Sequence, residues 1–183
     1  MTQRHTKTQP ETCKRPRWFA GRWRLGVLLG EGEYSKVYLG VDVTGRTAAV
    51  KLVEVAGMDE EVRERFVQEA LLMATLNHPA IVGFVDFGFD HNLQADGLVV
   101  EYVSGGCMRA LLRTGAWPSL ETILDTLADV ASALANIHAE GVVHGDLKPA
   151  NIMLPHHPTG ARARLIDFGA SRITCAQAPH DDD

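Results

Sequence analysis

Cysteine is scarce in this chain, and its placement follows no disulfide or metal-binding pattern. The 183 residues contain three cysteines, Cys13, Cys107 and Cys175, which lie far apart and are odd in number. No Cys-x-x-Cys pair and no Cys/His ligand spacing is present, which argues against a disulfide framework or a structural zinc site. We expect the thiols to stay reduced, and the chain therefore to be cytoplasmic.

Long apolar stretches are also missing. The sequence has no run of about 18 apolar residues that could cross a membrane, so we expect no membrane segment. Its basic start is not followed by the apolar core of a signal peptide.

The chain as a whole has no excess of positive charge. Its net charge of −5 argues against nucleic acid as a partner. The charge is unevenly spread, because residues 1–17 hold a single acidic side chain, Glu11, against the basic set Arg4, Lys7, Lys14, Arg15 and Arg17. This composition predicts a disordered basic tail over residues 1–20.

What is present is a succession of strands followed by helices. Period-two apolar patterns between glycine-containing turns predict strands at residues 22–30, 37–43, 47–55, 81–87 and 98–103. A 3.6-residue period predicts a helix over residues 59–76. After a predicted hinge at Ser104-Gly105-Gly106 come predicted helices at 108–113 and 120–139 and short strands at 152–154 and 163–166. The fold class is α+β, with a sheet lobe over 21–103 and a mainly helical part over 104–183.

The segment from His144 to Asn151 carries the residues that phosphoryl transfer needs. Asp146, Lys148 and Asn151 lie at offsets 0, +2 and +5, and Asp167 follows a short apolar strand in Asp-Phe-Gly. We assign Asp146 to orienting the attacking hydroxyl and Lys148 to stabilising charge on the transferring group. Asn151 and Asp167 offer oxygen ligands for Mg²⁺, with Mn²⁺ as a possible substitute.

Two charges on apolar faces predict a buried ion pair. Lys51 lies in a strand whose two faces are otherwise apolar, and Glu69 interrupts the apolar stripe of the helix at 59–76. A buried charge is costly unless an opposite charge meets it. We therefore expect Lys51 and Glu69 to pair.

A glycine-rich turn lies between the first two predicted strands. It reads Gly30-Glu31-Gly32-Glu33-Tyr34-Ser35-Lys36-Val37, with Ser35 at the place of a third glycine. Glycines let backbone amides approach phosphate oxygens, which makes Gly30, Glu31, Gly32 and Ser35 candidate nucleotide contacts. The strand on each side argues against a dinucleotide-binding fold, in which a helix follows the glycines directly.

With these motifs in this order, the chain resembles the catalytic domain of eukaryotic-type (Hanks-type) serine/threonine protein kinases. The resemblance implies a five-stranded N-terminal lobe with one helix and the first part of the helical C-terminal lobe. It also implies ATP as phosphate donor and a protein serine or threonine as acceptor, since Lys148 is typical of that branch.

The resemblance further implies an adenine site. Val100 would be the gatekeeper, and backbone groups of Glu101 and Val103 would bind the base. The ring would pack between Val37, Ala49 and Met153. The column that aligns the two lobes would contain Met73, Phe168 and His144.

Two departures from the family pattern stand out. The family's His-Arg-Asp is His144-Gly145-Asp146 here, so the arginine that receives an activation-loop phosphate is absent. Only 14 residues follow Gly169, without an Ala-Pro-Glu motif. We therefore expect a truncated C-terminal lobe, and self-association through its uncovered surface.

Two other functions stay open from the sequence. One is a non-catalytic ATP-binding or regulatory kinase fragment. The other is a small-molecule phosphotransferase of the aminoglycoside or choline kinase type, in which His-Gly-Asp is common. Lys148, the glycine-rich turn and His78-Pro79 favour the protein kinase.

Overall fold

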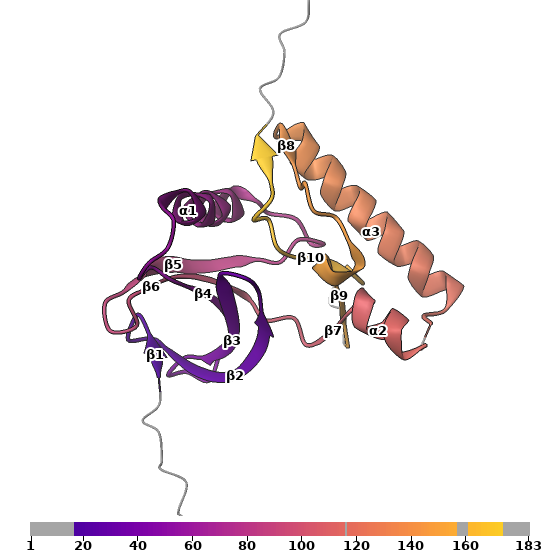
Figure 1. Ribbon diagram of the computed structural model, residues 1–183. Helices are drawn as coiled ribbons and strands as arrows, with labels where there is room; N and C mark the ends of the chain where they lie inside the picture. Colours follow the sequence, from indigo (N-terminus) through magenta and orange to yellow (C-terminus); the bar gives the residue numbers. More distant parts are fainter. Residues whose placement is uncertain (1–16, 116, 157–160, 174–183) are drawn as a thin grey trace, which may run out of the picture.

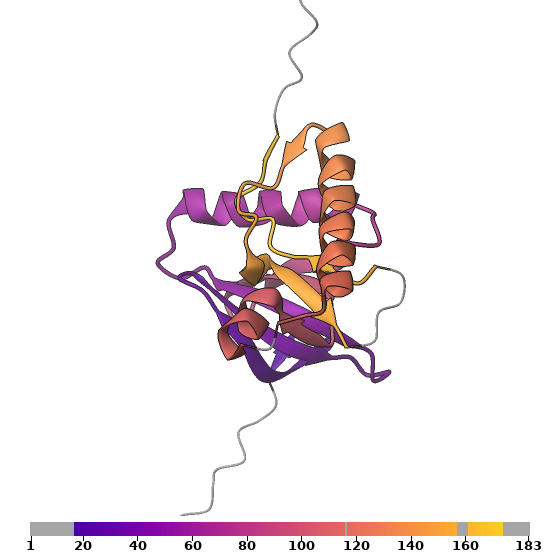
Figure 2. The same cartoon turned by 90° about the vertical axis from the view of Figure 1, so that its right-hand side faces the viewer.

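The computed structural model describes residues 17–115, 117–156 and 161–173. Residues 1–16 of the predicted tail (residues 1–20) and the final residues 174–183 lie outside this range. A twisted sheet with helix α1 forms one part, and α2, α3 and several short strands form the other (Figure 1; Figure 2 shows the same molecule turned by 90°). This arrangement confirms the α+β fold class.

The N-terminal sheet is antiparallel and has six strands in the order β1-β2-β3-β4-β6-β5. Its strands are β1 (Trp18–Phe19), β2 (Trp23–Glu31), β3 (Ser35–Val41), β4 (Thr47–Glu54), β5 (Phe84–Asp90) and β6 (Ala95–Glu101). Five of them are the predicted ones. The strand expected at 81–87 begins at Phe84 instead, because Ile81 forms only an isolated bridge to Leu165 of the other part.

Strand β1 was not predicted, and it places the start of the folded unit closer to the N-terminus than the predicted residue 21. Phe19 is 1% exposed and packs with Trp23 in a core on one face of the sheet. Gly97 makes room for it, since a Cβ there would lie 2.2 Å from the Phe19 ring. The tail prediction is therefore wrong for residues 17–20.

Helix α1 (Glu60–Thr75) covers the other face of the sheet. Asp59 caps it by accepting a hydrogen bond from the Glu61 amide, which satisfies one of the unpaired amides of the first turn. Its buried residues are Phe66, Glu69, Ala70 and Met73. They belong to a hydrophobic core that continues into the second part of the chain.

The second part contains two helices and two small sheets. The helices are α2 (Met108–Thr114) and α3 (Leu120–Ala139); β7 (Gly105–Cys107), β9 (Ile152–Pro155) and β10 (Arg164–Leu165) form one sheet, and β8 (Val142–Val143) and β11 (Arg172–Ile173) form the other. Backbone hydrogen bonds from Val82 and Leu165 join the two parts, at 3.0 and 2.7 Å. None of the described helices combines the length and apolarity that crossing a membrane requires.

Helix α3 has the predicted bounds and buries only one of its two apolar faces. Thr126, Val130, Ala133 and Ile137 are buried. Leu120, Leu124 and Leu127, which are also spaced to share one side of the helix, are 72%, 57% and 58% exposed. Both faces are apolar at helical spacing, so periodicity could not decide between them.

Candidate active site

Lys51 lies at the centre of the site, on the face of β4 that α1 covers. Its ammonium Nζ lies 2.8 Å from both carboxylate oxygens of Glu69 and 3.1 Å from Oδ1 of Asp167. The predicted pair of Lys51 and Glu69 is therefore present. Asp167 is a third member of the cluster, and it links α1, β4 and the segment after β10.

The surroundings keep this lysine charged. Burial disfavours the ammonium, but the carboxylates of Glu69 and Asp167 outweigh it and raise the pKa of Lys51. The Glu69 side chain is only 5% exposed. Burial raises the pKa of Glu69, and Lys51 opposes that shift. A buried carboxylate of this kind depends on its cation, because removing one partner of such a pair typically costs about 3–5 kcal/mol.

The loop before β9 brings three predicted residues into one hydrogen-bonded group. The ammonium of Lys148 lies 2.5 Å from Oδ2 of Asp146. Asn151, in the short 3₁₀ helix η1 (Pro149–Asn151), donates from its side-chain amide to the Asp146 carbonyl at 2.9 Å and to Oδ2 at 3.1 Å. The hydrogen bond from Lys148 is the main reason that the pKa of Asp146 is lowered. This carboxylate therefore stays ionised, as a proton acceptor must.

The orientation of Asn151 suits an oxygen ligand to Mg²⁺. Its amide nitrogen Nδ2 donates to two oxygens of Asp146, which leaves the carbonyl oxygen Oδ1 at the other end of the side chain for a ligand. Its backbone carbonyl accepts a hydrogen bond of 2.9 Å from Ile166, the residue before Asp167. The described residues contain no cluster of three or more His, Cys, Asp or Glu for a metal. One amide and one carboxylate fit Mg²⁺, which usually keeps waters and phosphate oxygens as its other ligands.

The backbone around Asp167 and Phe168 is fixed by packing. Asp167 has a φ of 65°, a left-handed conformation that is uncommon for a residue other than glycine. Phe168 is buried and packs against His144 with the two rings tilted by 50° and their centroids 4.8 Å apart. Met73 is buried in the same core as Phe168. Burial lowers the pKa of His144, which favours a neutral imidazole in this core.

Gly145, between His144 and Asp146, is required by the local backbone. Its φ is 77°, and a Cβ there would lie 2.3 Å from the carbonyl oxygen of Ala170. Ser171 donates from its hydroxyl to the His144 carbonyl at 3.2 Å. The segment after Asp167 therefore packs directly against the loop, at the point where the family pattern has an arginine.

The glycine-rich turn and part of the expected adenine site share a sheet face with Lys51. The turn is closed by a 2.8 Å hydrogen bond from the Gly32 amide to the Ser35 carbonyl. Val37 pairs with Lys51 across the strands, and Ala49 pairs with Val100. Paired residues point to the same side of a sheet. The three adenine-site candidates Val37, Ala49 and Val100 are half-buried.

The remaining adenine candidates come from other segments. Met153 lies on β9, opposite Cys107 of β7. Glu101 ends β6, and its amide already donates to the Gly83 carbonyl at 2.8 Å. Val103 is half-buried two residues further on, against the core that joins the two parts.

The sequence interpretation missed one ion pair that fixes α1. Arg63 Nε donates to Asp96 on β6 at 2.7 Å, and the Asp96 side chain is 5% exposed. The hydrogen bond with Asp96 raises the pKa of Arg63. No local sequence pattern marks this pair, because Arg63 and Asp96 lie 33 positions apart and meet only through packing.

Comparisons with known proteins agree with this geometry. A family profile described as "Protein kinase domain" matches residues 23–181. A probable serine/threonine-protein kinase of Streptomyces coelicolor is 38% identical over 161 residues, which cover 86% of this chain and 24% of the relative. Serine/threonine-protein kinase pkn2 of Myxococcus xanthus is 40% identical over 161 residues, which cover 84% of this chain and 18% of the relative.

A third relative gives the same result. Serine/threonine-protein kinase PknA of Mycobacterium tuberculosis is 37% identical over 163 residues, covering 86% of this chain and 37% of the relative. The chain thus spans between about a fifth and a little over a third of the length of these three relatives.

Proposed function

Since this chain belongs to the protein kinase domain family, whose members use ATP, we propose that it transfers the γ-phosphate of ATP to serine or threonine of a protein. The observation that carries the proposal is the position of Lys51, whose ammonium lies between the carboxylates of Glu69 and Asp167. A cation held in this way can bind the phosphates of ATP without having to be ordered first.

In the proposed reaction, Asp146 orients the substrate hydroxyl and accepts its proton. The hydroxyl oxygen bonds to the γ-phosphorus, the bond from that phosphorus to its bridging oxygen breaks, and ADP leaves. Lys148 stabilises the charge that develops on the transferred group, from its position 2.5 Å from Asp146. Mg²⁺, held by Asn151 Oδ1 and the Asp167 carboxylate, would neutralise charge on the phosphate oxygens.

Nucleotide binding is tested through thermal stability. Mg·ATP should stabilise the chain, by about 2.7 kcal/mol at a hundredfold excess over Kd. Lys51→Met should abolish this stabilisation. Arg46→Met is the matched control, because Arg46 is an exposed cation in the turn between β3 and β4, away from Lys51, and it should leave the stabilisation unchanged.

Transfer is tested with labelled ATP and a basic protein acceptor, and Asp146→Ala should abolish labelling. Stabilisation by ATP without transfer to any acceptor would contradict the transfer step and favour a nucleotide-binding regulatory module. Transfer to an aminoglycoside or to choline, with none to protein, would favour the small-molecule phosphotransferase, which the His144-Gly145-Asp146 loop also allows.

A further inference from the structure

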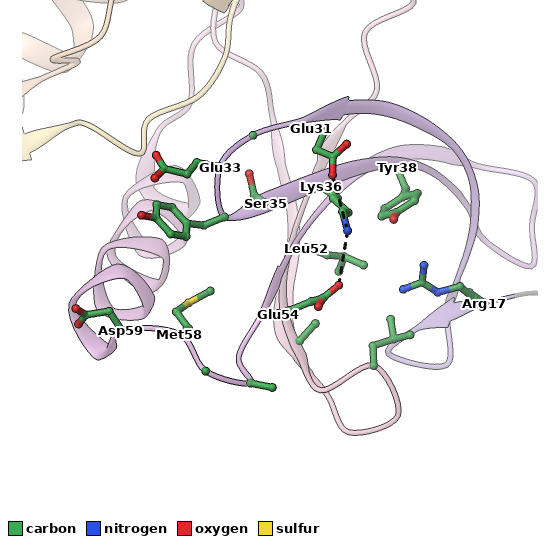
Figure 3. A pocket seen from close by; sticks show the side chains of 16 residues that line it. Arg17, Glu31, Glu33, Ser35, Lys36, Tyr38, Leu52, Glu54, Met58 and Asp59 are labelled. Carbon is green, nitrogen blue, oxygen red and sulfur yellow. Dashed lines mark ion pairs between the residues drawn. The ribbon is translucent and has the colours of Figure 1, made fainter.

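A cavity of about 470 Å³ lies beside the glycine-rich turn, on the face of the sheet opposite Lys51. Lys36 and Leu52 are paired across the strands and line it, whereas their neighbours Val37 and Lys51 point to the other face. The turn from Glu31 to Ser35 forms one wall, and the segment before α1 forms another. Figure 3 shows the lining side chains.

The lining is acidic around an apolar floor. Leu52 and Ala95 are buried beneath it. Four carboxylates line it, Glu31, Glu33, Glu54 and Asp59, against the two cations Arg17 and Lys36. Lys36 already lies within 3.8 Å of Glu31 and 3.9 Å of Glu54. Among the described residues, no cation lies within ion-pair distance of Glu33.

Arg17, the first residue that the structure describes, lines this cavity. Arg17 lies over the Tyr38 ring at 5.6 Å, and its carbonyl accepts a hydrogen bond of 2.8 Å from Leu25. In Figure 3, Arg17 lies across the cavity from Asp59 at the start of α1. The segment that precedes Arg17 carries Arg4, Lys7, Lys14 and Arg15 and a single acidic residue, Glu11.

We propose that this basic N-terminal segment, residues 4–15, binds the acidic cavity, with Lys14 and Arg15 opposite Glu33 and Glu54. Charge complementarity selects the occupant, and the short connection to Arg17 gives it a high effective concentration. The segment would then contact the glycine-rich turn from the face of the sheet opposite Lys51. Bound in this way, the segment would restrain nucleotide binding. That restraint rests on the proposed function, whereas binding of the segment to the cavity does not.

Amide hydrogen exchange in the full chain, without nucleotide, tests the proposal. The amides of residues 31–36 and 54–59 should exchange about fivefold faster when Lys14→Glu and Arg15→Glu are combined, the scale expected for two exposed ion pairs. Glu33→Lys combined with Glu54→Lys should give the same increase. All four substitutions together restore the opposite charges and should restore the protection.

The matched control is Glu64→Lys with Glu140→Lys, which changes the charge equally at exposed residues outside the cavity lining and should leave these amides unchanged. Failure of the four-fold swap to restore protection would overturn the proposal. So would an effect of the cavity substitutions without an effect at Lys14 and Arg15, since the occupant would then be another molecule. Neither result would bear on phosphoryl transfer, because no ATP is present.

Discussion

At the scale of single residues, the hydrogen bond between Lys148 and Asp146 is expected to set the charge state of the proposed base. Lys148→Met removes the main cause of the lowered pKa of Asp146, so that pKa should rise toward the ordinary value of about 4. Folded Asp146 should then protonate at higher pH than in the parent. Carbon-13 NMR titration of the Asp146 carboxyl measures this directly. An unchanged titration would show that Lys148 does not contact Asp146 in solution.

Gly145 gives a second test at this scale, on stability. Gly145→Ala places a Cβ at a φ of 77° and within 2.3 Å of the Ala170 carbonyl. The left-handed conformation alone should cost about 1–2 kcal/mol, and the close approach should add to it. Urea unfolding measures the loss. Gly88→Ala is the control, because a Cβ at Gly88 would meet nothing within 4 Å; an equal loss there would contradict this reasoning.

At the scale of secondary-structure elements, we expect two ion pairs to hold α1 against the sheet, Lys51 with Glu69 and Arg63 with Asp96. Asp96→Asn weakens the bond to Arg63, whose length is 2.7 Å, and should cost about 1–3 kcal/mol because a buried partner loses its charged hydrogen bond. It should also speed amide exchange along α1. The control Glu61→Gln removes the exposed pair with Arg65 on the same helix and should cost about 0.5 kcal/mol at most. Equal effects of the two substitutions would refute this role for Asp96.

The elements also show how far the sequence could predict the structure. Both long helices were predicted to within one residue, because their apolar periods are long. In the structure Asp59 and Ser119 cap their first turns. Strand β1 was missed, since two residues carry no periodic signal and its stability comes from Phe19 meeting Gly97 far along the chain.

The same contrast holds in the site. Lys51 and Glu69 could be paired from sequence because each interrupts an apolar face. Arg63 and Asp96 could not, since they are joined across 33 positions by packing alone. The second carboxylate on Lys51, from Asp167, depends on how the second part of the chain meets the first, which no local pattern encodes.

At the scale of the whole molecule, the exposed face of α3 is expected to control the state of this polypeptide in solution. Leu120, Leu124 and Leu127 expose 57–72% of their surface on one side of the helix, and clustered apolar surface of this kind favours association. We expect the 183-residue chain to self-associate, so that its melting temperature rises with protein concentration. Leu124→Lys combined with Leu127→Lys should shift the chain toward monomer in analytical ultracentrifugation. Val43→Lys, at an 82% exposed valine on the other part of the molecule, should leave association unchanged. A monomer that melts at the same temperature at every concentration would contradict this prediction.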